Sequence, residues 1–394
     1  MRAFTLSLRQ LKTHYFAVYG VFGCVSPYIS VYLRDVKSLA PAQLGVIFAA
    51  GQIGVFILPV AMTFLADRYR LVAPLLIALF AINTVAMAGL SFAWGFWACL
   101  VCIFFNQLAN QPQMALSDGL FFSLQSDPHQ PRTPYPQVRV WGTFGFICPS
   151  LLIFALFPWG GLHLVPYMAI VCALLGLLNA SRMPRRRPAT TTTATRLPTL
   201  DAARLLLRPS LALFCTGIGC LLVTNAAYYG FYPLYLTQEM GIPARWVGLI
   251  ANLGVVLEIG YMLMFERLRS LLGLHGLILL GASAILLRMT LLGFVAHPAA
   301  AVGLQATHGL TVIGVLIAPL MHVNAQVVSD SYRSSVQGLY AMFVVGVSSI
   351  FGNYVAGHLV EQFGLVTLYQ LASGFALFGL LLVSGSLYAQ RSPR

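Results

Sequence analysis

Residues 183–209 read MPRRRPATTTTATRLPTLDAARLLLRP and form the one long polar interruption in an otherwise apolar sequence. The segment combines a run of arginines, several prolines and a low-complexity threonine tract, a composition typical of a loop. The parts of the chain before and after it, 1–182 and 210–394, are nearly equal in length. The segment therefore divides the chain into two halves, and the pattern within each half decides the fold.

The composition excludes several classes of protein. Of the 394 residues, 59% are hydrophobic and only 8% are charged, whereas about a quarter of the residues are charged in soluble chains. The net charge of +13 would indicate a nucleic-acid partner only if the basic residues gathered on one polar face, and the sequence has no such face. All seven cysteines lie inside apolar runs, which is typical of small core residues and not of disulfides or metal ligands. We therefore expect no nucleic-acid partner, no metal and no cofactor.

A helix that spans a bilayer needs about 20 mostly apolar residues, and stretches of that length recur along the chain. Twelve such stretches fit, with limits that hold to within several residues. They run near residues 14–33, 42–65, 71–94, 96–123, 139–158, 162–182, 210–236, 245–265, 271–295, 298–328, 335–358 and 364–388. They leave no room for a soluble catalytic domain, so we do not expect an enzyme. The sequence predicts an all-α integral membrane protein with twelve transmembrane helices.

The polar interruption places six of these helices in each half. We therefore expect an amino-terminal six-helix bundle over 1–182, a cytoplasmic basic linker over 183–209 and a carboxy-terminal six-helix bundle over 210–394. Basic residues support this topology because Lys and Arg collect on the cytoplasmic side of a membrane. With both termini inside, nineteen of the 23 basic residues lie on that side. We expect a monomeric, multi-pass protein of a bacterial inner membrane, with both termini in the cytoplasm.

An internal repeat supports the division into halves, as in transporters built from two related bundles. A Tyr-Leu pair is followed, thirteen residues after the tyrosine, by a glycine with two aliphatic residues, and six residues later by a second glycine. The matching positions are Tyr32, Leu33, Gly45 and Gly51 in the first half, and Tyr235, Leu236, Gly248 and Gly254 in the second. The halves are therefore expected to be pseudo-symmetric.

The turn after the second predicted helix carries a charged motif, TFLADRYRL, at residues 63–71. Its core LADR matches the signature G-x-L-A-D-R-x-G-R of the major facilitator superfamily, although both flanking glycines and the last arginine are replaced. The chain thus resembles this superfamily, in which two six-helix bundles flank a central substrate cavity. The resemblance implies that Asp67 and Arg68, with Glu266 and Arg267 at the matching turn of the second half, form a conformational gate. The alternative is a solvated turn that only reinforces topology.

A closer resemblance is carried by four further segments. They are SDGL with Asp118, YPQVRVWGT at 135–143, AAYYGF at 226–231 and GVVLE at 254–258. These segments are similar to the phenylpropionate permease branch of the superfamily, which is related to the lactose and nucleoside proton symporters. The resemblance covers nearly the full length except 183–209, and it implies uptake of a small solute together with a proton.

Charged residues inside a span are costly, about 2.5–3.5 kcal/mol each on insertion scales, so each needs a partner or a function. Glu258 lies thirteen residues beyond Arg245, or about 20 Å into its helix, and is the deepest carboxylate. Desolvation at such a depth favours the protonated form of a carboxyl. The resemblance also places an acid here, so Glu258 is our candidate proton site. The alternative is a permanently protonated, structural glutamate.

Two charges near the inner ends of neighbouring helices have compatible depths. Asp118 lies about five residues, or about 8 Å, from the inner end of its helix, and Arg139 begins the next helix on the same side. We therefore expect them to form an ion pair. Such a pair could take part in proton coupling through Asp118 and bind substrate through Arg139, or it could be purely structural.

Arg288 and His308 are expected at nearly the same depth. Arg288 is about eight residues from the outer end of its predicted helix, and His308 is about ten residues from that side in the next. A buried arginine without a carboxylate could attract an anionic substrate, and a histidine could relay a proton. Glu258 is deeper, so we do not expect it to pair with Arg288. For His308, a satisfied core histidine is the alternative.

Neutral polar residues mark the expected cavity. Gln107 and Gln111 share a helix face with Asp118 because their spacings are four and seven residues. Asn225, Tyr228, Tyr229 and Tyr232 repeat at helical spacing and form a hydroxyl-rich aromatic face that could stack on a ring. These side chains, with Arg139 and Arg288, are the predicted substrate-binding residues.

We therefore expect a secondary transporter that works by alternating access. The expected activity is proton-coupled uptake of a small organic solute, with an aromatic carboxylate such as a phenylpropionate as the first candidate. A proton-coupled exporter of drugs or metabolites, or a sugar or nucleoside symporter, is the alternative. A P-loop, an H-E-x-x-H motif and a G-x-S-x-G motif are all missing from the sequence, so it offers no support for a membrane enzyme.

Overall fold

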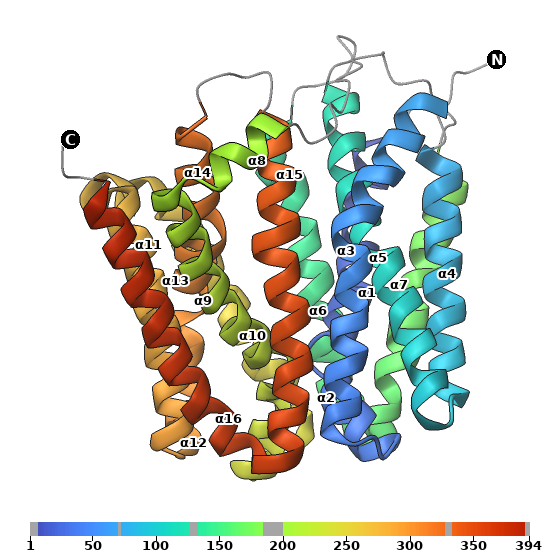
Figure 1. Ribbon diagram of the computed structural model, residues 1–394. Coiled ribbons are helices and arrows are strands. Elements are labelled where there is room, and N and C mark those ends of the chain that lie inside the picture. The colour runs from blue at the N-terminus through green and yellow to red at the C-terminus, as the bar shows by residue number, and fades with distance from the viewer. Residues whose placement is uncertain (1–6, 70–71, 126–132, 184–199, 328–332, 391–394) are drawn as a thin grey trace. The chain divides into compact units, whose positions relative to one another are not determined.

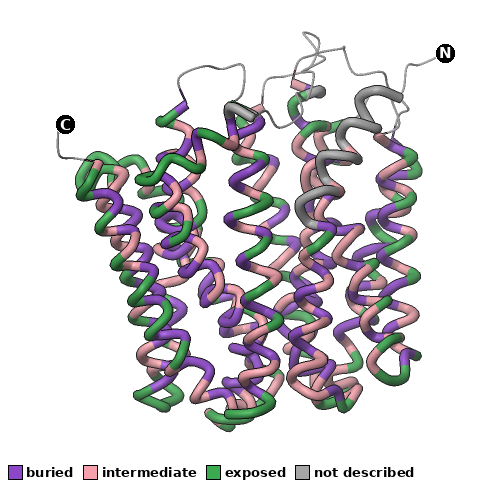
Figure 2. The backbone as a smooth tube through the Cα atoms, viewed as in Figure 1, coloured by how far each residue is buried: buried purple, intermediate pink, exposed green. Residues whose placement is uncertain are grey.

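The computed structural model describes residues 7–69, 72–125, 133–183, 200–327 and 333–390. Within these ranges the chain is helical and contains no strand (Figure 1). The all-α prediction is therefore confirmed for the described residues. The long helices carry both buried and exposed positions (Figure 2), as expected for helices that pack on one face and contact lipid on another.

The first half contains six long helical segments. α1 (Leu8–Val25) is followed, after a bend of 45°, by the segment Ile29–Val36. The later helices are α3 (Pro41–Tyr69), α4 (Val72–Phe92), α5 (Gly95–Gln125), α6 (Tyr135–Gly160) and α7 (Leu164–Ser181). A capping box starts α1, because the Ser7 hydroxyl accepts from the Gln10 amide N–H while the Gln10 side chain accepts from the Ser7 N–H.

The second half begins with the short α8 (Leu200–Leu206), which lies inside the segment predicted as a linker. The long helices are α9 (Pro209–Leu234), α10 (Val247–Leu263), α11 (Phe265–Phe294) and α16 (Val347–Ala389), with α15 (Arg333–Leu339) and the π-helical η8 (Tyr340–Gly346) preceding α16. Between α11 and α15 the chain runs through α12 (Pro298–Gly303), η5 (Leu304–Thr307), α13 (His308–Thr311), η6 (Val312–Ile317) and α14 (Ala318–Ala325). This last set of short elements replaces one continuous helix.

Seven of the described helices are long and apolar enough to cross a bilayer, or eight when α1 and Ile29–Val36 count as one. Two of them, Tyr135–Ser181 and Ser335–Ala389, have 47 and 55 residues. Each is broken at a glycine with positive φ, Gly161 and Gly364, so each holds two of the predicted spans. α3 and α5 have 29 and 31 residues and correspond to the remaining two. The twelve predicted spans are thus accounted for.

The chain divides into two compact units. The first consists of Met1–Leu39, Ala50–Ala194 and Ala244–Leu249, and the second of Ala40–Ala49, Thr195–Pro243 and Ile250–Arg394. α3 and α10 therefore contribute residues to both units. The predicted bundle limits stay a prediction, and residues 184–199 of the predicted linker lie outside the described ranges.

Close helix contacts through glycine organise the first unit around α1. A Cβ atom on Gly23 would overlap the Phe146 carbonyl of α6, and a Cβ on Gly145 would overlap the Phe16 carbonyl of α1. Small residues at such crossings let two backbones approach, which is a common way to pack helices in a membrane. The contact fixes α6, and with it Arg139, beside α1.

Three asparagines join α4 to α5 in a closed ring of hydrogen bonds. Asn83 Nδ2 donates to Asn110 Oδ1 at 2.9 Å, Asn110 Nδ2 to Asn106 Oδ1 at 3.4 Å, and Asn106 Nδ2 to Asn83 Oδ1 at 3.0 Å. All three side chains are buried. Each amide donates once and accepts once within the ring, so it satisfies polar groups that lipid could not.

The internal repeat is confirmed by matching hydrogen bonds in the two halves. Tyr32 Oη donates to the Leu90 carbonyl at 3.4 Å, and Tyr235 Oη donates to the Leu292 carbonyl at 2.7 Å. Both tyrosines begin a π-helical turn, η1 (Tyr32–Val36) and η3 (Tyr235–Glu239). Each π-helical turn therefore ends its transmembrane helix in the same way, tied to the helix two spans later.

Candidate functional site

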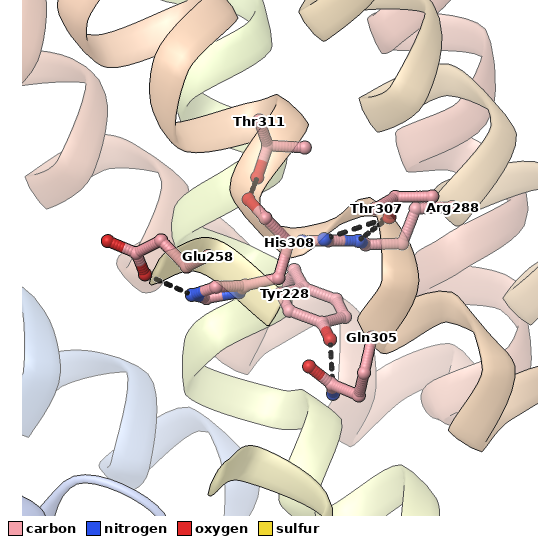
Figure 3. Close-up of polar contacts among 7 residues, drawn as sticks. All are labelled: Tyr228, Glu258, Arg288, Gln305, Thr307, His308 and Thr311. Carbon is pink, nitrogen blue, oxygen red and sulfur yellow. Dashed lines mark hydrogen bonds and ion pairs between the residues drawn. The ribbon is translucent and has the colours of Figure 1, made fainter. Parts of the chain in front are cut away.

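The second unit brings an acid and a histidine into contact. Glu258 comes from α10 and His308 from the first position of α13. The Nε2 atom of His308 lies 3.1 Å from Oε2 of Glu258, with side chains 12% and 26% exposed respectively (Figure 3). Both groups can hold a proton, so the pair can exist with or without an added proton. We call these two residues the Glu258–His308 pair.

Two glycines permit this contact. A Cβ on Gly309 would lie 2.9 Å from the Cα of Glu258 and would overlap the Tyr261 ring. A Cβ on Gly254 would overlap the Gln305 amide oxygen and lie 3.2 Å from His308 Cγ. The backbones of α10 and α13 therefore approach each other more closely than alanine would allow.

The backbone around His308 is irregular. A 3₁₀ segment, η5, precedes α13, and a π-helical segment, η6, follows it. Thr307 Oγ1 donates to the Leu304 carbonyl at 2.7 Å, and Thr311 Oγ1 donates to the His308 carbonyl at 2.8 Å. Hydroxyl groups thus satisfy carbonyls where regular helical bonding is interrupted. Departures from α-helical geometry of this kind are frequent at functional sites.

Arg288 of α11 is fully buried and lies beside this backbone. Its Nε and Nη2 atoms both donate to Thr307 Oγ1, at 3.3 and 3.0 Å (Figure 3). Its guanidinium carbon lies 4.2 Å from the centre of the Tyr228 ring. The Nη1 atom has no hydrogen-bond partner, and no carboxylate among the described residues forms an ion pair with Arg288. A buried guanidinium with an unused donor can bind an anion through charge-assisted hydrogen bonds.

An aromatic wall from α9 lines the cluster. The rings of Tyr228 and Tyr232 are stacked, with centroids 4.6 Å apart, and Tyr229 meets His308 edge to face at 5.9 Å. Tyr228 Oη accepts from Gln305 Nε2 at 3.1 Å, and Tyr232 Oη donates to the Ala301 carbonyl at 2.8 Å. Tyr229 is 45% exposed, so its ring is accessible to a solute. Buried Asn225, on the same helix, has an Oδ1 atom without a hydrogen-bond partner.

The prediction of an ion pair between Asp118 and Arg139 is wrong. Asp118 Oδ1 instead accepts from Tyr15 Oη at 2.6 Å and from Tyr135 Oη at 2.8 Å. Arg139 Nη2 donates to Tyr19 Oη at 2.6 Å, and its guanidinium carbon lies 4.0 Å from the Tyr19 ring centre. Each charged side chain therefore bonds to tyrosine hydroxyls, and the Tyr15 ring also lies 6.0 Å from the Arg139 guanidinium carbon. These side chains form a second polar cluster, which lies in the first unit.

The remaining predicted residues are placed as follows. Gln107 and Gln111 of α5 are partly buried, as is Asp118 on the same helix. The side chains of Asp67 and Arg68 lie outside the described part of the structure. Exposed Glu266 forms a 3.7 Å ion pair with Arg269 on its own helix, and Arg267 is exposed. The gate assigned to these four residues stays a prediction.

Several side chains that bond to the charged and aromatic residues of the two clusters were not predicted from the sequence. Tyr15, Tyr19 and Tyr135 were not expected to bind the two charges of the first unit, and Gln305 and Thr307 were not expected beside Tyr228 and Arg288. A usable signal was present for the last two, because Gln305 and Thr307 are polar residues next to His308 in an apolar span. Nothing in the sequence indicated that Gly309 lies against the backbone of Glu258.

The family model for the MFS_1 like family matches residues 8–371. The chain belongs to this family. Its membership confirms the resemblance to the major facilitator superfamily and, with the apolar helices, an integral multi-pass membrane protein. The family and the helices together account for the two six-helix halves expected from the sequence.

Three curated relatives align with nearly the whole chain. The probable 3-phenylpropionic acid transporter of Escherichia coli (strain K12) is 27% identical over 91% of this chain and 92% of its own. The xanthosine permease of the same organism is 26% identical over 94% and 93%. The maltose permease of Geobacillus stearothermophilus is 26% identical over 94% and 92%. These relatives are permeases, so this family member is a transporter of small molecules and not an enzyme.

Solved structures give the same fold. The crystal structure of the nucleoside transporter NupG superposes with a TM-score of 0.83 at 19% identity, covering 98% of this chain and 100% of that chain. An auto-inhibited peptide transporter of the POT family superposes with a TM-score of 0.74 at 14% identity, covering 98% and 97%. At these identities the likeness concerns the fold alone.

Proposed function

We propose that this transporter couples the uptake of a small organic anion to the entry of a proton, and that an aromatic carboxylate such as 3-phenylpropionate is its substrate. The observation that carries the proposal is the environment of Arg288. A permanently charged group is buried there with a free Nη1 donor, next to a carboxyl–imidazole pair that can take up a proton. An anion site and a proton site thus share one cluster.

The proton is assigned to the Glu258–His308 pair. A carboxylate and an imidazole 3.1 Å apart can share an added proton, since either group can carry it. The partial exposure of both side chains, 12% for His308 and 26% for Glu258, supports exchange of that proton with water. Asp118, bonded to two tyrosines, is the secondary candidate for proton coupling.

The carboxylate of the substrate is assigned to Arg288. A guanidinium binds carboxylates through charge-assisted hydrogen bonds, which are about twice as strong as neutral ones. The accessible ring of Tyr229 provides a surface on which an aromatic substrate can stack, and Asn225 offers an unpaired polar atom. The similarity to the probable 3-phenylpropionic acid transporter supports this substrate class. Arg139, Gln107 and Gln111 are assigned to the substrate path contributed by the first half.

The transport cycle follows alternating access. The Glu258–His308 pair takes up a proton from outside, the anion binds at Arg288, and both are released into the cytoplasm after the two halves rock against each other. The protein acts as a monomer in a bacterial inner membrane with both termini cytoplasmic. The excess of Lys and Arg on the expected inner side supports this orientation.

A Glu258→Gln variant tests the proton assignment. In proteoliposomes with an imposed pH gradient, the wild type should accumulate labelled 3-phenylpropionate above its external concentration. The variant should exchange internal for external substrate but not accumulate it, because an amide cannot carry the proton. Undiminished uphill uptake by the variant would contradict the assignment.

A neutral solute is the second candidate. The relatives include a xanthosine permease and a maltose permease, and the amides of Asn225 and Gln305 could bind such a solute. A thermal-shift comparison of purified protein with 3-phenylpropionate, xanthosine and maltose separates these substrates. Export is tested with everted vesicles, in which a proton antiporter would load solute and a symporter would not.

A further inference from the structure

Away from helix ends and breaks, the described spans of the second unit contain one arginine, Arg288, and one carboxylic acid, Glu258, and both belong to the same cluster. Arg288 contacts Thr307, and the next residue, His308, contacts Glu258. His322 lies apart from them, packed on Phe214 and His275. The net charge of the cluster is therefore set by Arg288 and the Glu258–His308 pair.

The other titratable groups packed around the pair do not change this charge. Tyr229 reaches His308 from α9, and Tyr261 lies beside Gly309 from α10. A tyrosine is neutral near pH 7. Arg288, from α11, remains protonated throughout the accessible pH range. The pair is thus the one variable charge in the cluster.

The charge of each binding state follows directly. Without a proton the pair carries −1 and Arg288 carries +1, so the empty cluster is neutral. One added proton raises the total to +1, and one monovalent anion alone lowers it to −1. Proton and anion together return the total to zero. An uncompensated charge in a low-dielectric interior is unfavourable, so both partly loaded states are penalised and the empty and fully loaded states are not.

We infer that one proton and one monovalent organic anion bind this cluster as a charge-compensating pair, so that transport is electroneutral with a 1:1 stoichiometry. The inference rests on the proposed function and adds the mechanism of coupling: each ligand removes the penalty that the other would incur. It also restricts the substrate class to monoanions. With one proton bound, a dicarboxylate would leave the loaded cluster at −1, which is an uncompensated charge in the protein interior.

Proton uptake during binding is the first test. Purified protein in unbuffered detergent solution at pH 8, with a pH indicator, is titrated with 3-phenylpropionate, and bound anion is measured in parallel with a labelled sample. The wild type should take up one proton for each anion bound. The Glu258→Gln variant should bind the anion with no proton uptake, because its empty cluster is already at +1 and the anion alone neutralises it. The neutral analogue 3-phenylpropionamide should cause no proton uptake in either protein.

Charge movement is the second test. Proteoliposomes with a pH gradient take up labelled 3-phenylpropionate while potassium and valinomycin set a membrane potential of either sign. The initial rate should be the same at all potentials, and solid-supported-membrane recordings should show no transport current. A ratio of zero or two protons per anion, or a potential-dependent rate with a current, would overturn the inference.

Electroneutral coupling and the proposed function are overturned by different results. Uptake that is driven by the pH gradient but moves charge overturns electroneutral coupling and leaves the proposed function standing. Absence of saturable 3-phenylpropionate binding, in protein shown to be folded by its thermal transition, overturns both.

Discussion

Gly309 stands so close to Glu258 that a methyl group added at residue 309 would lie 2.9 Å from the glutamate Cα. This approach brings His308, the neighbour of Gly309, within reach of the Glu258 carboxylate. We therefore expect Gly309→Ala to separate α13 from α10 and to break the Glu258–His308 pair. Uphill uptake of 3-phenylpropionate in proteoliposomes should fall at least tenfold, which corresponds to about 1.4 kcal/mol.

Gly260→Ala is the matched control for this variant. Gly260 also lies in α10, two residues from Glu258, and a Cβ there would meet no atom within 4 Å. Alanine stabilises a helix relative to glycine by about 1 kcal/mol, so this variant should melt at the same or a higher temperature and transport normally. Equal transport by the two variants would contradict the role assigned to Gly309.

Removal of the Arg288 charge should separate stability from binding. Arg288→Gln deletes a buried charge that has no described ion-pair partner, and one proton taken up by the Glu258–His308 pair then keeps the empty cluster neutral. The melting temperature of the apoprotein should therefore stay the same or rise. The affinity for 3-phenylpropionate should fall about 10- to 100-fold, because a hydrogen bond to a charged group contributes about 1.5–3 kcal/mol. Both quantities are measured on the same sample, by thermal melting and by equilibrium binding.

Thr307→Val should lower the stability of the protein while it keeps the charge that binds the anion. It removes the hydroxyl that accepts from both Nε and Nη2 of Arg288 and leaves the guanidinium in place. A buried donor without its partner costs about 1–3 kcal/mol, so the melting temperature should fall while the anion, which supplies new acceptors, restores part of the loss. A variant that melts like the wild type would show that this hydroxyl does not support Arg288.

The ring of three asparagines predicts that replacing one of them lowers the stability of the protein more than replacing all three. Asn83→Leu leaves a buried donor on Asn106 and a buried acceptor on Asn110 without their partners, at a cost of about 1–3 kcal/mol. The triple variant Asn83→Leu, Asn106→Leu and Asn110→Leu removes all of these polar groups. Thermal melting should therefore rank the single variant below both the wild type and the triple variant. A triple variant that is the least stable of the three would contradict this reasoning.

The two matching tyrosines should contribute unequally. Tyr235 Oη reaches the Leu292 carbonyl at 2.7 Å, whereas the equivalent bond of Tyr32 to Leu90 is 3.4 Å long, beyond the usual range for such a bond. Tyr235→Phe should therefore cost about 1 kcal/mol of stability and Tyr32→Phe less. Melting temperatures of the two variants, compared with the wild type, check this order.

The sequence predicted the spans and the depths of the charged residues because both depend on position along a helix. A rise of 1.5 Å per residue places Arg288 and His308 at similar levels, and the structure connects them through Thr307. The direction in which a side chain points around its helix depends on how neighbouring helices pack. That is why Asp118 and Arg139 have compatible depths yet bond to tyrosines and not to each other.

The close approach at Gly309 could not be predicted for the same reason. The sequence contains 35 glycines, and many of them would face open space or flexible side chains if replaced. Only the packing of α10 on α13 distinguishes the one that touches the Glu258 backbone. The irregular segments η5 and η6 were likewise hidden, since an apolar span predicts a helix but not its hydrogen-bonding pattern.

The matched tyrosines also show what the two copies of the repeat no longer share. Glu258 follows the repeat glycine Gly254 by four residues, and the residue four positions after Gly51 is Val55. Arg288 precedes Leu292, the acceptor of Tyr235, by four residues, and the residue four positions before Leu90 is Ala86. Both halves thus have the tyrosine bonds at their helix ends, whereas only the second half has this glutamate and this arginine at the equivalent positions. The two halves are therefore symmetric in the hydrogen bonds at their helix ends and asymmetric in the charged residues inside their helices.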